Sequence, residues 1–78
     1  MRLNPAEYVI FKFGGVRATA RALDKTPSTI SKWQHNNKGK IPTSSMLAIL
    51  MKAEELNLDI NADDLIYGRE ISTSEFTI

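Results

Sequence analysis

Apolar residues recur at helical spacing in the first part of the chain. Their positions match the i, i+3, i+4, i+7 pattern of a helix with one buried face: Ala6, Val9, Ile10 and Phe13. Asn4 can cap this helix, Pro5 suits its first position, and Glu7 can bond back to the cap. Glycine at 14 and 15 ends it, because glycine adopts the left-handed cap conformation without strain. The pattern predicts a helix over about residues 5–13.

Two shorter helical stretches follow, with a short polar connection between them. The stretch 16–23 is rich in alanine and carries apolar residues on one side. Pro27 cannot continue that helix but can open a new one. We therefore predict helices at 16–23 and at about 27–35. The apolar side chains of the second are Ile30 and Trp33, which we expect to face inward.

A longer apolar stripe runs through the second half of the chain. Its members are Met46, Ile49, Leu50, Ala53 and Leu56. The stripe predicts a fourth helix that begins with Pro42 and Thr43 or Ser44. Asn61 can cap a short fifth helix that continues through Tyr67.

The tail from Ile71 to Ile78 is rich in serine and threonine, with Phe76 and Ile78 two residues apart. This pattern fits a short strand, a partner-binding extension or a frayed end, and the sequence leaves the three open. The predicted fold class is all-α, with five helices and a short C-terminal β-strand as one outcome for the tail. We expect one domain over 1–78, with its core at about 4–68 and the tail at 69–78.

Composition narrows the classes of function. The absence of cysteine excludes disulfides and thiolate metal sites, and the single histidine has no second histidine to bind a metal with. No catalytic arrangement or glycine-rich phosphate loop is present, so we expect no enzyme, cofactor, metal or small-molecule substrate. No apolar run approaches the roughly 18 residues that span a bilayer, so we expect no membrane association and a cytoplasmic location.

Charge is divided unevenly along the chain. Residues 1–40 hold eight bases and two acids, a net charge of +6, whereas residues 41–78 hold two bases and seven acids, a net charge of −5. Such asymmetry indicates one surface that faces a polyanion and one that avoids nucleic acid. The alternative is a solvated basic face without a partner.

The segment from Val16 to Trp33 reads VRATARALDKTPSTISKW. It resembles the helix-turn-helix of the phage Cro and CI repressor family. Ala20 is small where that motif brings two helices close, and the apolar positions also match. With its flanks, the similarity covers about residues 5–56. The turn differs, because the family has glycine and an aliphatic residue where this chain has Asp24 and Lys25. Aspartate tolerates the left-handed conformation, and Lys25 can add a phosphate contact.

A recognition helix at 27–35 with its apolar side inward presents polar side chains to the DNA major groove. We expect contacts to bases from Pro27, Ser28, Ser31 and Lys32, positions to which the resemblance also points. The expected contacts to the DNA backbone, with an ordinary solvated surface as the alternative, are Arg17, Thr26, Thr29, Gln34, His35, Asn36, Lys38 and Lys40. Lys12 and Arg21 are expected to be solvated.

The resemblance implies a sequence-specific repressor of phage or prophage type that binds double-stranded operator DNA. We expect a homodimer, with association weak enough to occur mainly on DNA, because one recognition helix reads only a few base pairs. The expected dimer contacts are Phe76, Ile78 and Ile71, with local core packing as the alternative. Two other functions remain open: an antitoxin-type autoregulator on the same fold, and a protein-interaction module without DNA binding.

Overall fold

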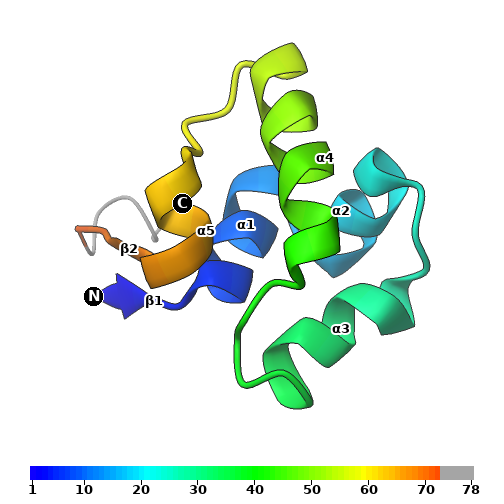
Figure 1. Ribbon diagram of the computed structural model, residues 1–78, viewed down its shortest axis with the longest axis horizontal. Helices are drawn as coiled ribbons and strands as arrows, with labels where there is room; N and C mark the ends of the chain where they lie inside the picture. Colours follow the sequence, from blue (N-terminus) through cyan, green and yellow to red (C-terminus); the bar gives the residue numbers. More distant parts are fainter. Residues whose placement is uncertain (73–78) are drawn as a thin grey trace.

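The computed structural model describes residues 1–72. In this part of the chain five helices combine with two short strands (Figure 1). In chain order the elements are β1 Arg2–Leu3, α1 Pro5–Phe13, α2 Val16–Leu23, α3 Pro27–His35, α4 Thr43–Glu55, α5 Ala62–Tyr67 and β2 Arg69–Glu70. The protein is therefore mostly helical, and the five helices lie where the sequence predicts them.

Two helices begin with capping boxes. The Asn4 side chain accepts from the Glu7 N–H at 2.8 Å, and the Glu7 carboxylate accepts from the Asn4 N–H at 2.9 Å. Asn61 and Asp64 exchange the same pair of bonds at the start of α5. Each box satisfies two backbone groups that a helix leaves unpaired, which explains why α1 and α5 begin where they do.

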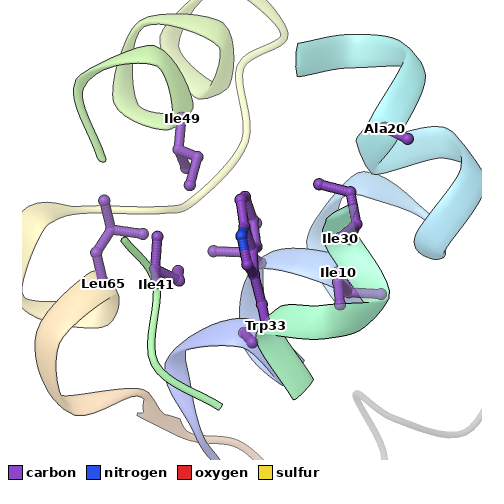
Figure 2. Close-up of a cluster of buried hydrophobic side chains, with 9 residues drawn as sticks. Ile10, Ala20, Ile30, Trp33, Ile41, Ile49 and Leu65 are labelled. Atoms are coloured by element: carbon purple, nitrogen blue, oxygen red, sulfur yellow. The ribbon is translucent and has the colours of Figure 1, made fainter. Parts of the chain in front are cut away.

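Trp33 lies at the centre of the main core. Figure 2 shows its indole between Ile10 and Ile30 on one side and Ile41, Ile49 and Leu65 on the other. The tryptophan is 2% exposed, which confirms the prediction that it faces inward. The Trp33 side chain thus packs against residues of α1, α4 and α5, and this contact anchors the buried side of α3.

A smaller core joins the two ends of the described chain. β1 pairs with β2 in antiparallel register, with Arg2 opposite Glu70 and Leu3 opposite Arg69. Directly after β2, Ile71 is 4% exposed and packs with Leu3 and Tyr8. β1 was not predicted, because two residues of strand leave no periodic pattern.

The buried position of Ile71 corrects its expected role as a dimer contact. Its side chain is occupied inside the protomer, so local packing is the better explanation of its apolar character. The short strand of the C-terminal part lies at Arg69–Glu70. The other expected dimer contacts, Phe76 and Ile78, lie outside the described residues.

A cluster of charges fastens α5 and β2 to α1. The Arg69 guanidinium donates to both oxygens of the buried Asp64, at 2.8 and 2.7 Å, and to Asp59 at 3.0 Å. It also lies 4.9 Å from the centre of the Tyr8 ring. The hydrogen bond and charge of Arg69 hold the pKa of the Asp59 carboxyl below its usual value. Charge in this half of the protein is used to hold the fold together.

Candidate nucleic-acid interface

The pair of helices α2 and α3 is joined by a tight turn of three residues. Asp24 ends α2 in the left-handed conformation, with φ 57° and ψ 47°, and the Lys25 N–H donates to the Ala20 carbonyl at 2.8 Å. This is the bonding expected of a left-handed helix end, here formed without glycine. The turn directs α3 across α2 immediately after α2 ends. The small side chain of the buried Ala20 lets the two helices approach each other closely.

The two sides of α3 differ sharply in burial. Ile30 is 0% exposed and Trp33 is buried beside it, whereas Pro27, Ser28 and Lys32 are exposed. Ser31 is half-buried on the same outward side. Residues 28, 31 and 32 are three and four positions apart, so they share one face of the helix. The four expected base-contacting residues therefore belong to one outward-facing surface, although Ser31 is the least accessible.

Hydroxyl groups gather at the first turn of α3. Thr26 caps the helix, and its Oγ1 accepts from the Thr29 N–H at 3.3 Å. The same oxygen lies 3.2 Å from the Ser28 hydroxyl and 2.9 Å from the Thr29 hydroxyl. These short side chains are thereby held close to the backbone. Each hydroxyl can both donate and accept, so it can exchange its local partner for either a donor or an acceptor on DNA.

The expected backbone contacts do not all lie together. Arg17, Thr26, His35, Asn36, Lys38 and Lys40 are exposed, and Thr29 is half-buried. Gln34 is half-buried. It lines a hollow together with residues of β1 and α1, among them Leu3 and Phe11. Lys40 lines another hollow, with Met46 and Leu65, so the structure does not group either residue with the exposed face of α3.

The connection between α3 and α4 is tied down at Gly39. Its N–H donates to the Trp33 carbonyl at 2.8 Å, and its carbonyl accepts from the Ala6 N–H at 2.9 Å. A Cβ at this position would overlap the Asn4 side chain, and φ is +82°, so only glycine fits without strain. The backbone between Lys38 and Lys40 is consequently fixed by hydrogen bonds from Gly39 to α3 and to α1.

Positive charge collects around the α2–α3 pair. Residues 16–40 contain six bases and one acid, a net charge of +5. The ion pairs within residues 1–72 involve Met1, Lys52 and Arg69, and none of these six bases. The other two bases of the first forty residues are engaged elsewhere: Arg2 donates to the Tyr67 carbonyl at 2.7 Å, and the Lys12 ammonium lies 5.7 Å from the Tyr8 ring centre.

Two further bases lie near Arg17. Arg21 is exposed, in line with the expectation that it is solvated, and together with Lys25 and Arg17 it lines one hollow. Arg17 and Arg21 are four positions apart on one face of α2, whereas Lys25 lies in the turn after the left-handed Asp24.

Comparisons with protein-family models, with characterised proteins and with solved structures found no match to this chain.

Within residues 1–72, no group of three or more histidine, cysteine, aspartate or glutamate side chains is placed to hold a metal ion. In the same part of the chain, none of the helices has the length and apolar character needed to cross a membrane. What the α2–α3 region does offer is an exposed helix face with hydroxyl groups and an ammonium, surrounded by bases that form no ion pair within residues 1–72. That combination can bind a polyanion and contact its polar edges.

Proposed function

We propose that this protein is a sequence-specific DNA-binding repressor that uses α2 and α3 as a helix-turn-helix of the Cro and CI type. One observation carries the proposal: α3 buries Ile30 and Trp33 while it leaves Pro27, Ser28 and Lys32 exposed, among bases that form no ion pair with any residue of 1–72. A helix that is firmly anchored on one side and polar on the other is suited to enter a groove.

The chemistry of the exposed face fits the major groove. That groove is about 12 Å wide and admits one α-helix. Serine hydroxyls can donate to or accept from any base edge, and a lysine can reach the acceptors of guanine. The Pro27 ring can contact a thymine methyl group. Small side chains at positions 27, 28 and 31 let the helix backbone approach the bases closely.

We further propose that the protein acts as a homodimer on a symmetric site. A helix of nine residues reads only a few base pairs. Two copies that present their α3 helices about 34 Å apart would reach successive major grooves on one side of the duplex. Binding at a promoter would then repress transcription by excluding polymerase from the same DNA.

Selection of binding sites from random duplex DNA, followed by footprinting, tests the proposal. We expect a short enriched sequence with two-fold symmetry and a protected region that spans both halves. Enrichment of a single asymmetric half-site would remove the dimer from the proposal. Failure to enrich any sequence, with no retention of duplex DNA at low salt, would contradict DNA recognition and favour a protein-binding module.

A further inference from the structure

The outer side of α4 carries two large apolar side chains that residues 1–72 leave uncovered. Leu47 is 68% exposed and Met51 is 63% exposed. They lie four positions apart, which is about one helical turn, so they share one face. The buried residues of this helix are Ser45, Ile49 and Ala53. The exposed pair therefore points away from the core, where apolar surface is unfavourable unless a partner covers it.

Polar side chains flank the apolar pair toward both ends of the helix. Thr43 and Ser44 are exposed in its first turn, and Glu54 and Glu55 are exposed in its last turn. At about 3.6 residues per turn, all four lie within roughly 60° of the direction in which the apolar pair points. An apolar centre with a polar rim is the usual composition of a protein interface. We call these six residues the α4 face.

The charges of α4 are poorly matched to its own dipole. Its N-cap residue, Pro42, makes no side-chain cap bond, and its first turn contains no acid to balance the positive end. Its last turn holds Glu54 and Glu55, although the negative end of a helix disfavours carboxylates. Lys52 pairs with Glu55 at 3.0 Å, whereas Glu54 forms no ion pair within residues 1–72. Both acids would be better placed beside the start of a second α4.

We propose that the α4 face binds the same face of a second copy, with the two helices antiparallel about a two-fold axis level with Ile49. This axis exchanges positions 47 and 51, so Leu47 of each copy packs against Met51 of the other. It also exchanges positions 43 and 44 with positions 55 and 54. The carboxylates of one copy thereby reach the uncapped start of the other α4, where the hydroxyls of Thr43 and Ser44 can donate to them.

The inference rests on the homodimer of the proposed function and names its contact surface. Ile71 is buried within the protomer, so it does not supply that contact. The α4 face shares no residue with the exposed face of α3, so the two contacts use separate parts of the chain. A helix of 13 residues is about 20 Å long, and one such pair covers less than the roughly 1,200–2,000 Å² of a stable interface. We therefore expect weak association in the absence of DNA.

Sedimentation equilibrium of the full chain without DNA, up to about 1 mM protein, measures this association. The variants are Leu47→Ser and Met51→Ser, and native circular dichroism confirms that each is folded. Leu56→Ser is the matched control, because Leu56 is 50% exposed but lies about half a turn away around α4. Each side chain occurs twice in a symmetric dimer, so we expect each face variant to raise the dissociation constant by about tenfold or more. The control should match the parent.

The antiparallel pairing has a second test, because the chain contains no cysteine. Leu47→Cys and Met51→Cys chains with tags of different length are mixed in equal amounts and oxidised. We expect the mixed disulfide to exceed the half share that random pairing gives, since position 47 of one copy lies opposite position 51 of the other. A mixed share of one half or less would overturn the antiparallel register.

The outcomes separate this surface from DNA recognition. A parent protein that stays monomeric at the highest concentration, or face variants that associate as strongly as Leu56→Ser, would overturn the α4 interface. Sites enriched from random DNA in that case would still support the reading face of α3. If association depends on Leu47 and Met51 while no DNA sequence is enriched, the α4 interface stands and the proposal of DNA recognition fails.

Discussion

The two halves of this protein use charge in opposite ways. Around α2 and α3, six bases stand without ion-pair partners among the described residues. At the other side of the molecule, where α5 and β2 meet the N-terminus, Arg69 is engaged by two aspartates and a tyrosine ring (Figure 1). Paired charges there hold elements together, whereas the bases around α2 and α3, without ion pairs in residues 1–72, lie on the surface that we propose binds DNA.

The difference teaches which substitutions should affect folding and which should affect binding. Unpaired exposed bases contribute little to stability, so the α2–α3 surface can change with small folding cost. A buried carboxylate with one guanidinium partner has no such freedom, because loss of the partner leaves a charge in a nonpolar setting. Four substitutions, ordered by expected effect, probe this contrast.

Trp33→Ala should cause the largest loss. The indole is 2% exposed and contacts residues from several helices, so its removal leaves a cavity beneath α3. We expect the free energy of unfolding to fall by about 3–5 kcal/mol, measured by urea denaturation. DNA binding should fall with the folded fraction. A variant that keeps parental stability would show that α3 is not anchored through this side chain.

Arg69→Ala should destabilise by about 2–3 kcal/mol, somewhat less than for a fully buried ion pair, since Arg69 keeps 29% side-chain exposure. Asp64 would lose both guanidinium bonds while it stays 3% exposed. Equilibrium denaturation measures the loss, and Lys52→Ala on α4 is the control for an exposed ion pair. Equal stability of the two variants would refute a structural role for the Arg69 cluster.

Ser28→Ala, Ser31→Ala and Lys32→Ala should weaken DNA binding and leave stability nearly unchanged, in contrast to the two substitutions above. Each should reduce affinity for the selected site by about 1–3 kcal/mol while the free energy of unfolding changes by roughly 0.5 kcal/mol or less. Competition between the selected site and random duplex provides the internal control, because a lost base contact weakens only the former. Unchanged affinity in all three variants would remove α3 as the reading helix.

Asp59→Asn should give the smallest effect, visible as a change in pH dependence. The hydrogen bond and charge of Arg69 lower the pKa of Asp59 in the folded protein below the 3.8 of an aspartate in an unfolded chain. Its contribution to stability is therefore present above about pH 4 and is lost as the pH falls through the folded-state pKa. Denaturation midpoints from neutral to acid pH should show the variant below the parent at neutral pH and the two converging in acid.

A matched control for that comparison is Glu54→Gln, which removes one exposed carboxylate from α4 without touching Arg69. If Asp59→Asn and the parent lose stability in parallel on acidification, the ion pair with Arg69 does not contribute to the pH dependence of folding.

The helices could be predicted from the sequence because their causes are local. Apolar spacing, the Asn4 and Asn61 caps, and Pro27 all act within a turn or two of chain. For the same reason the outward placement of Ser28 and Lys32 followed from the inward placement of Ile30 and Trp33, since a helix has a fixed period.

What the sequence did not predict depends on contacts between distant residues. The pairing of Leu3 with Arg69 joins the two ends of the described chain, and the Tyr8 hydroxyl donates to the Asp59 carbonyl across 51 positions. Neither leaves a repeating pattern. The position of Gln34 beside α1 was missed for the same reason, because it depends on how two helices cross and not on either helix alone.

The hydrogen bond between the Ala6 amide and the Gly39 carbonyl gives this molecule a built-in reporter. Ala6 is fully enclosed, far along the chain from the lysines at 38 and 40, yet its amide is bonded to the residue between them. A ligand that binds Lys38 or Lys40 and shifts their backbone will change the chemical environment of the Ala6 amide proton, which is buried. The NMR chemical shift of this one proton, compared between the free and the bound protein, therefore reports binding at the segment between α3 and α4 without a label on the surface.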